Sequence, residues 1–310
     1  MSPKPVILDV DPGHDDAVAL MMACGAPGLD LRAVTTVAGN VSLEKTTRNA
    51  LRVLSLIGRA DVPVAAGAAQ PLERPLRTAT DIHGESGLDG PEEVPDATFE
   101  ADGRGAVDLI ADTLRESPEP VTLVPVGPLT NIALFLREHP ELKHRIERIS
   151  LMGGSIGLGN TTPAAEFNIY VDPEAAREVF DSGLPITMSG LDVTHQAGAG
   201  PKERERLRSL GEVGGVVAGF LEFFAATYES IYGFDAPPLH DPVAVAAVLD
   251  PTLLKTRLMN VDVECEGELT RGETVCDFYG VTGKLANADV GIELDREGFF
   301  ELLYESLGNL

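Results

Sequence analysis

The chain has 310 residues, of which 44% are hydrophobic and 5% aromatic, a length and composition that suit one large α/β domain. Asp and Glu total 49 against 24 Lys and Arg, which gives a formal net charge of −25. This balance argues against nucleic acid and anionic membranes as partners, because binding to either relies on a basic surface.

Short apolar runs typical of buried strands alternate along the chain with segments of helical periodicity. In chain order we predict strand Pro5–Val10, helix Asp16–Cys24, strand Leu31–Ala38, helix Leu43–Ile57, strand Val62–Ala66, helix Gly105–Arg115, strand Val121–Val126, helix Leu129–Arg137, strand Ile146–Met152, helix Pro173–Asp181, strand Pro185–Ser189, helix Asp241–Leu249 and strand Leu258–Val263. The alternation predicts a single open, mostly parallel, doubly wound α/β sheet flanked by helices.

Two further stretches fall outside that alternation. Thr78–Pro95 is rich in Gly, Pro and acidic residues and predicts a long loop, whereas Pro201–Phe234 predicts a helical excursion. No repeat and no linker composition marks a boundary, so we expect residues 1–310 to form one domain.

Cysteine usage and the N-terminus bear on the cellular compartment. The three cysteines are too few and too scattered for a disulfide framework. The stretch MSPKPVILDVD has no apolar h-region of a signal peptide, and no apolar run approaches the length of a membrane span. We therefore expect a cytoplasmic globular protein with reduced thiols.

Polar side chains follow five of the predicted strands, at the ends where open parallel sheets bind their ligands. Nearly all are carboxylates or amides, and they are Asp9, Asp11, Asp15, Asp16, Asn40, Asn131, Asn160, Glu166, Asn168, Asp192 and His195. A solvated rim would include Lys and Arg among them. We therefore expect one shared polar active site at the C-terminal strand ends.

The stretch DVDPGHDDAVAL, residues 9–20, carries four carboxylates. Asp15 and Asp16 fit the cap and first turn of a helix, but Asp11 does not. Buried carboxylates that converge need a cation, and all-oxygen ligands favour Ca²⁺ or Mg²⁺. The segment is not an EF-hand or an aspartyl-phosphate motif, because Gly13 stands where each pattern requires another residue.

Two histidines have both a structural and a functional interpretation. His240 precedes Asp241 in PPLHDP, where Asp241 is either a helix cap or a further metal ligand and His240 is a titratable proton donor. His83, in HGESG, is either a surface residue or part of a lid over the site. The run MGGSIGLG lacks the GxGxxG order, and the chain has no P-loop, so we expect no dinucleotide site.

Eight short blocks occur in order over roughly residues 5–308: DVDPGHDDAVAL, TTVAGN, HGESGLDGP, VGPLTN, LMGG, AEFNIYVDPEAA, GLDVTH and LHDP. Together they resemble the inosine–uridine nucleoside hydrolase family. HGESGLDGP, LGNTTPAAEFNIYVDP and DFYGVTG are most similar to its bacterial pyrimidine-specific ribonucleoside hydrolases. The resemblance implies hydrolysis of the N-glycosidic bond of a small-molecule nucleoside, one bound Ca²⁺, the open α/β sheet, and a homodimer or homotetramer.

The resemblance also implies a role for individual residues of this chain. The calcium ligands would be Asp11, Asp16, Asp241 and the backbone carbonyl of Val126. Asp15, Asn40 and Asn168 would hold the ribose 2′- and 3′-hydroxyls, and Asn160 and Glu166 the 5′-hydroxyl. Met152 would form an apolar wall under the sugar. Near the base the family places His83, His240, Tyr228 and Tyr232. Asp9 has no ligand role and would support the turn.

The implied reaction passes through an oxocarbenium-like ribose, whose positive charge suits a ring of carboxylates. We expect Asp11 to act as the base toward a Ca²⁺-bound water. His240 would act as the acid for the leaving pyrimidine, directly or through a tyrosine.

Three alternatives remain. The first is a nucleoside hydrolase without preference between purines and pyrimidines. The second is a metal-dependent phosphoryl or glycosyl transfer enzyme that uses the DxD pair, but it would need a basic pocket, and none is evident near Asp11. The third is a catalytically idle nucleoside- or sugar-binding protein, although every matched site position here is filled.

Overall fold

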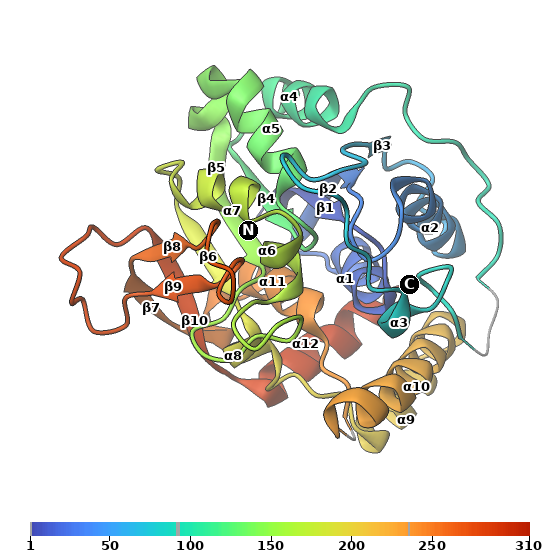
Figure 1. The fold of residues 1–310 in the computed structure, drawn as a ribbon. Coiled ribbons are helices and arrows are strands. Elements are labelled where there is room, and N and C mark those ends of the chain that lie inside the picture. Colours follow the sequence, from blue (N-terminus) through green and yellow to red (C-terminus); the bar gives the residue numbers. More distant parts are fainter. Residues whose placement is uncertain (1, 91–93, 235) are drawn as a thin grey trace.

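A sheet of eight strands runs through the computed structural model, which describes residues 2–90, 94–234 and 236–310 (Figure 1). Its strands, in spatial order, are β3 (Val64–Ala66), β2 (Leu29–Thr36), β1 (Lys4–Val10), β4 (Val121–Pro125), β5 (Ile146–Met152), β6 (Ile186–Ser189), β10 (Ala288–Leu294) and β7 (Leu254–Met259). All neighbours pair in parallel except β10 and β7. The predicted mostly parallel α/β sheet is confirmed.

Helices cover both faces of this sheet. Those on one face are α1 (His14–Gly25), α2 (Leu43–Leu56), α11 (His240–Leu249) and α12 (Arg296–Leu307), and those on the other are α4 (Ala106–Glu116), α5 (Thr130–Glu138) and α7 (Pro173–Phe180). The predicted excursion forms α9 (Pro201–Arg208) and the long α10 (Glu212–Tyr232). The remaining helical segments are α3 (Thr80–His83), α6 (Phe167–Val171), α8 (Leu191–Thr194), η1 (Pro140–Arg145) and η2 (Pro251–Leu253).

The central strand β1 is buried on both faces, which accounts for its continuously apolar sequence. Val6 and Leu8 pack into the core beneath α1 and α11, whereas Ile7 packs into the core beneath α4 and α5. All three are at most 1% exposed. A parallel strand covered by helices on both faces buries every side chain, so it loses the alternating pattern of a half-exposed strand.

The order of the strands fixes the position of the site. From β1 the chain adds β2 and β3 on one side, and then β4, β5 and β6 on the other. The strand order therefore reverses between β1 and β4, and a crevice forms outside their carboxyl ends. The backbone N–H of Val126, just after β4, donates to the carbonyl of Asp9 at 2.8 Å. This bond holds the ends of β1 and β4 together beside the aspartates that follow β1.

The structure differs from the sequence prediction in three places. The predicted strand Leu258–Val263 is wrong as one element, because β7 ends at Met259 and β8 (Val261–Val263) belongs to a separate antiparallel pair with β9 (Thr274–Cys276). Asn260 stands at the break, and its side chain donates to the carbonyl of Leu285. The predicted loop Thr78–Pro95 contains the one-turn helix α3, and its residues 91–93 lie outside the described part. β10 and α12 were not predicted at all.

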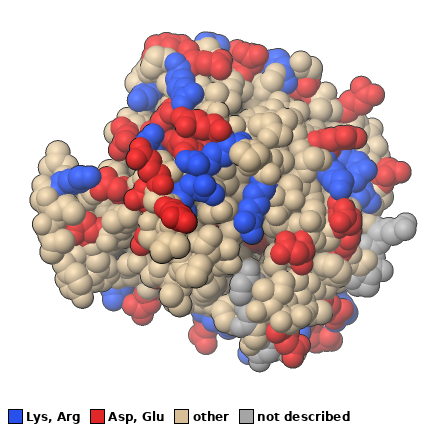
Figure 2. Space-filling model, viewed as in Figure 1, with Lys and Arg blue, Asp and Glu red and all other residues tan. Residues whose placement is uncertain are grey.

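Charged side chains of both signs lie close together on the face shown in Figure 2. The protruding segment around β8 and β9 is mainly uncharged there, and its large exposed apolar side chains are Leu269, Val275, Tyr279, Val281 and Leu285.

All three cysteines are free thiols. Over the described residues, no helix combines the length and apolarity needed to cross a membrane.

Candidate active site

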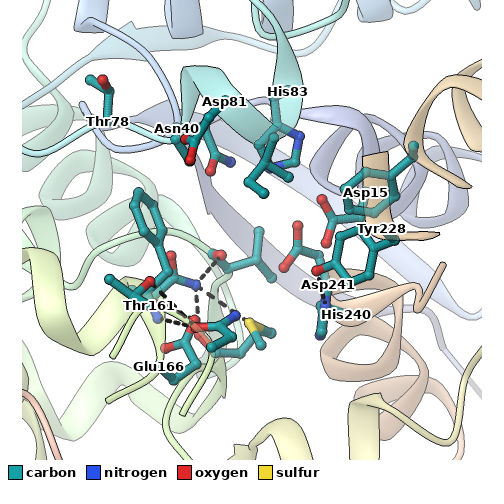
Figure 3. Close-up of a pocket in the computed structure, with 18 of the residues that line it drawn as sticks. Asp15, Asn40, Thr78, Asp81, His83, Thr161, Glu166, Tyr228, His240 and Asp241 are labelled. Carbon is teal, nitrogen blue, oxygen red and sulfur yellow. Dashed lines mark hydrogen bonds between the residues drawn. The ribbon is translucent and has the colours of Figure 1, made fainter. Parts of the chain in front are cut away.

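A pocket of about 260 Å³ lies at the carboxyl ends of the central strands (Figure 3). The predicted site residues that line it are Asp15, Asn40, His83, Val126, Met152, Asn160, Glu166, Asn168, Tyr228, His240 and Asp241. In Figure 3, Asn40 and His83 lie across the cavity from Glu166, while Asp15, Tyr228, His240 and Asp241 gather on a third side. The pocket also includes Arg77, Thr78, Asp81 and Thr161, which the sequence patterns did not single out.

Asp16 organises the turn between β1 and α1. One carboxylate oxygen accepts from the backbone N–H of Asp11 at 3.0 Å, and the other accepts from the backbone N–H of Gly13 at 3.0 Å and from Nδ2 of Asn40 at 3.1 Å. Asp16 is the third residue of α1, so its charge also lies where the helix dipole favours an anion. The helix-capping interpretation of the motif therefore holds for Asp16.

Asp11 lies just behind the pocket lining and is fully buried. Its Oδ2 accepts from the backbone N–H of Asn40 at 2.7 Å, whereas its Oδ1 has no hydrogen-bond partner among the described residues. The backbone closes around this carboxylate at two glycines. A Cβ at Gly39 would stand 2.1 Å from Oδ2, and one at Gly127 would stand 2.4 Å from Oδ1. Only glycine leaves room for the Asp11 carboxylate at those two positions.

Carboxylates converge at this end of the pocket. Oxygens of Asp15, Asp16 and Asp241 all lie within 4.8 Å of one another, and all three residues are buried. Burial, and then repulsion by neighbouring carboxylates, raises the pKa of Asp15 to about 8 and the pKa of Asp241 well above its usual range. No ion pair in the described stretches joins a Lys or Arg to this group. Such a set of buried oxygen ligands without a cationic partner fits a divalent metal ion.

This geometry adds Asp15 to the residues around the predicted metal position. The sequence interpretation assigned Asp15 to the sugar and Asp11 to the metal. Asp11 contacts the carboxylate group through Asp16, because the Asp16 carboxylate accepts from the backbone N–H of Asp11. The Oδ1 atom of Asp11 has no hydrogen-bond partner in the described part of the chain. The structure thus groups the carboxylates of Asp15, Asp16 and Asp241, of which Asp15 and Asp241 line the pocket, and places Asp11 behind them in contact with Asp16.

Asn168 ties two strand ends together. Its Nδ2 donates to the carbonyl of Val126 at 2.7 Å and to the carbonyl of Met152 at 3.1 Å. The amide nitrogen is therefore used within the protein, and its amide oxygen is the atom left to meet a ligand. The carbonyl oxygen of Val126 keeps a second lone pair beside the carboxylates.

Glu166 and Asn160 fix the loop that closes the far side. Glu166 caps α6 and accepts from the backbone N–H groups of Asn168 at 3.0 Å, Ile169 at 3.2 Å and Gly154 at 2.9 Å. Burial raises its pKa to about 7 despite these bonds. Oδ1 of Asn160 accepts from the backbone N–H of Phe167 at 3.0 Å. Both side chains are held rigidly in the pocket wall.

On the remaining side, Tyr228 from α10 meets His240 at the start of α11. The Tyr228 hydroxyl lies 2.9 Å from Nε2 of His240, and the hydroxyl of Thr194 lies 2.7 Å from its Nδ1. Burial lowers the pKa of His240 to about 3. Thr194 was not anticipated from the sequence. The side chain of Tyr232, the other predicted tyrosine, lies outside the described part of the structure.

Other strand-end residues have structural contacts instead. Oδ1 of Asp9 accepts from Thr35 Oγ1 at 2.6 Å and from Nδ2 of Asn131 at 2.7 Å. Asp192 accepts from the backbone N–H of Ile156 at 2.5 Å. Neither these residues nor His195 lines the pocket. His14, by contrast, contacts the pocket residue His83 directly and was not predicted as a site residue.

Comparison with known proteins covers almost the whole chain. The profile described as inosine-uridine preferring nucleoside hydrolase matches residues 6–301. The pyrimidine-specific ribonucleoside hydrolase RihA of Escherichia coli O7:K1 is 53% identical over 305 residues, which is 98% of each chain. A purine-preferring ribonucleoside hydrolase from Gardnerella vaginalis superposes with a TM-score of 0.92 at 36% identity, over 98% of both chains. A plant nucleoside hydrolase superposes with a TM-score of 0.91 at 35% identity, over 98% of this chain and 99% of that chain.

Proposed function

Because the chain belongs to the inosine-uridine preferring nucleoside hydrolase family, we propose that it hydrolyses the N-glycosidic bond of pyrimidine ribonucleosides. The products from uridine or cytidine are ribose and the free base. The observation that carries the proposal is one pocket that joins a group of buried carboxylates to the Tyr228–His240 pair. The 53% identity with a pyrimidine-specific enzyme favours uridine and cytidine. The likeness to a purine-preferring structure makes a non-specific hydrolase the second candidate.

A divalent cation, and specifically Ca²⁺, completes the site in this proposal. Its ligands would be carboxylates of Asp11, Asp16 and Asp241 and the backbone carbonyl of Val126. The unpaired, buried Oδ1 of Asp11 and the two glycines around that carboxylate support this assignment. When bound there, the ion would polarise the attacking water and offset the repulsion among the carboxylates.

We assign the sugar to the polar groups that the wall holds in place. Asp15, Asn40 and the amide oxygen of Asn168 face the ribose 2′- and 3′-hydroxyls. Asn160 and Glu166 face the 5′-hydroxyl, and Met152 supplies the apolar surface beneath the ring. As the glycosidic bond breaks, positive charge grows on the ribose, and the nearby carboxylates stabilise it.

Asp11 is the proposed base. In this proposal the Asp11 carboxylate would both contact the ion and accept the proton of the attacking water. The water attacks the face of the sugar opposite the base, so the reaction inverts the anomeric carbon.

His240 serves the leaving group on the other side of the pocket. A departing pyrimidine gains negative charge on its ring and must receive a proton or a hydrogen bond at O2. The Tyr228 hydroxyl, 2.9 Å from Nε2 of His240, provides the relay. His83 completes the lining near the base, and Tyr232 would stand beside the leaving pyrimidine.

We further propose that residues 1–310 form a single hydrolase domain that assembles as a homodimer or homotetramer. Two observations support a single domain. The eight-stranded sheet runs through the chain, and one family profile matches residues 6–301. The exposed apolar side chains around β8 and β9 support the homo-oligomer. The free thiols favour a cytoplasmic enzyme of pyrimidine nucleoside catabolism and salvage.

A product assay on uridine tests the proposed function. The purified protein should release uracil and ribose, lose this activity in EDTA, and regain it when Ca²⁺ is added back. Release that requires inorganic phosphate and yields ribose 1-phosphate would assign the site to group transfer. Absence of any base release from uridine, cytidine, inosine and adenosine would contradict the proposal.

A further inference from the structure

A second cavity, of about 270 Å³, adjoins the candidate active-site pocket. Its walls come from residues 74–77 ahead of α3, from the end of α6, and from Arg271 between β8 and β9. Arg77 lines this cavity and the active-site pocket alike, so the two hollows meet at that side chain. The second cavity is lined by three arginines, Arg74, Arg77 and Arg271, and by no Asp or Glu of the described chain. We call it the arginine cavity.

Tyr170 of α6 holds two of these guanidinium groups. Cζ of Arg77 lies 5.4 Å from the centroid of the Tyr170 ring, and Cζ of Arg271 lies 5.0 Å from the same centroid. Nη2 of Arg271 also donates to the Tyr170 hydroxyl at 2.9 Å. Because an aromatic ring attracts cations, Tyr170 keeps two like charges beside one side chain.

Neither Arg77 nor Arg271 has a carboxylate partner among the described residues. Arg74 does have one, because its Nη2 lies 2.7 Å from Oε1 of the buried Glu174. The difference is informative in a chain of net charge −25, where acidic side chains are abundant. Carboxylates line the adjoining pocket, and yet Arg77 lies against the aromatic ring instead. The arginine cavity therefore has two positive charges that no described carboxylate balances.

The arginine cavity is separate from the proposed metal position. Asp15, Asp16 and Asp241 do not line it. In Figure 3, Thr78, which follows Arg77 in the chain, stands well apart from Asp15 and Asp241. An anion in the arginine cavity would therefore not meet that group of carboxylates, whose repulsion would oppose its binding.

We propose that the arginine cavity is a binding site for a phosphate group, which contacts both Arg77 and Arg271. A guanidinium group presents parallel N–H donors that match the oxygens of phosphate, and it stays charged at physiological pH. A phosphate monoester carries close to two negative charges at pH 7, which matches the charge left unbalanced in the cavity. The proposal goes beyond the hydrolase function and does not depend on it.

Two sources of phosphate share this chemistry. One is inorganic phosphate from solution. The other is the 5′-phosphate of a nucleotide whose sugar lies in the adjoining pocket, because the two hollows meet at Arg77. In the proposed function Asn160 and Glu166 face the 5′-hydroxyl, and both line that pocket together with Arg77.

A purely structural role of the arginines makes the opposite prediction. Arg77 and Arg271 would then only fasten the segment ahead of α3 to α6, and the cavity would bind no anion. Arg257 offers an internal comparison, because its Cζ lies 4.1 Å from the centroid of the Phe278 ring. In the described structure a single guanidinium lies over that ring, so the charge pair that phosphate needs is lacking there.

Isothermal titration calorimetry with inorganic phosphate tests the proposal on the full-length protein, at low ionic strength and without free Ca²⁺. We expect saturable binding with a Kd of about 1 mM or lower. Arg77→Gln/Arg271→Gln should weaken binding at least about tenfold, since it removes charge-assisted hydrogen bonds. Arg257→Gln should leave the Kd unchanged, and acetate, with one charge, should bind the wild type more weakly. No saturable binding of phosphate, or equal binding by the double variant, would overturn the proposal.

The single variant Arg77→Gln keeps the test decisive if the double variant fails to fold, because Arg77 is exposed. It should also weaken phosphate binding, and an unchanged Kd would count against the site.

Uridine 5′-monophosphate distinguishes the two sources of phosphate. If its sugar lies in the active-site pocket, saturating uridine should raise the apparent Kd of the nucleotide but not that of inorganic phosphate. If uridine alters neither Kd, the cavity takes up a free phosphate group. In both cases Arg77→Gln should weaken the nucleotide, and equal affinity would contradict the proposal. A failure of uridine itself to bind would count against the hydrolase function alone.

Discussion

The Tyr228 hydroxyl lies 2.9 Å from Nε2 of His240, and this contact joins α10 to α11 beside the pocket. The next residue, Asp241, points its carboxylate instead toward Asp15 and Asp16, within 4.8 Å of both. Two consecutive residues at one helix start therefore serve two sides of the same cavity. In the proposed function, one side would supply a proton to the leaving base, and the carboxylates of the other would hold a metal ion and the sugar.

Replacing His240 should affect the chemical step more than binding. In His240→Ala the leaving pyrimidine loses its proton donor, so we expect kcat for uridine to fall about 10²-fold or more while KM changes little. Steady-state kinetics measure both. His195→Ala is the matched control. The ring centroids of His195 and His240 lie 5.6 Å apart, but His195 does not line the pocket. A His240→Ala enzyme with wild-type kcat would remove His240 from the acid role.

Asp11→Ala should abolish turnover and metal retention together. The variant loses the proposed base and one oxygen ligand, and the remaining carboxylates hold a divalent ion more weakly. Metal content after dialysis against trace Ca²⁺, measured beside uridine hydrolysis, checks both effects. Asp9→Asn is the control, since Asp9 contacts Thr35 and Asn131 and not the pocket. If Asp11→Ala kept its metal and its activity, the site assignment would fail.

The buried Glu166 should make stability fall as pH rises. Its pKa is about 7 in the folded protein against 4.5 for the ordinary group. The folded state therefore binds the proton more tightly, and its stabilising contribution is complete below pH 4.5 and lost as pH rises toward 7. The loss from this one group is roughly 3 kcal/mol. We expect the free energy of unfolding of the wild type, minus that of Glu166→Gln, to decrease between pH 5 and pH 8 in urea titrations without metal. A flat or rising difference would contradict the assignment.

The apolar segment around β8 and β9 should determine the assembly state. Tyr279 is 83% exposed and Leu285 is 91% exposed, which a homo-oligomer interface would cover. Light scattering after size exclusion should give a dimer or tetramer for the wild type and a smaller mass for Tyr279→Ser/Leu285→Ser. Leu310→Ser, at the partly exposed C-terminus, should leave the mass unchanged. A monomeric wild type, or a double variant of unaltered mass, would refute the interface.

The sequence predicted the central sheet well because strands such as β1 and β4 are buried on both faces, and because helices such as α2, α4, α5 and α7 between the strands are amphipathic. It failed at Leu258–Val263, since an apolar run continues across Asn260 while the backbone changes sheets. It also missed β10, which pairs with β7 across more than 25 residues of intervening chain. Periodicity reports local environment, but strand pairing at that separation depends on tertiary packing.

The candidate site was predictable where polar residues follow strands, because the topology brings strand ends together. Most of the eleven predicted residues that line one pocket follow those strand ends, and the others come from α3 (His83), α10 (Tyr228) and the start of α11 (His240 and Asp241). Contacts within the wall were not predictable. Nothing local marks Thr194 as the partner of His240, or His14 as the partner of His83. Both partnerships depend on how helices far apart in the chain pack against one another.

The most direct test of the central claim compares kcat/KM for uridine, cytidine, inosine and adenosine with the wild-type enzyme in the presence of Ca²⁺. The proposed function predicts values for uridine and cytidine at least about tenfold above those for inosine and adenosine, a difference of about 1.4 kcal/mol in transition-state binding. Equal values would favour the non-specific hydrolase. Higher values for the purine nucleosides would contradict the proposed pyrimidine preference.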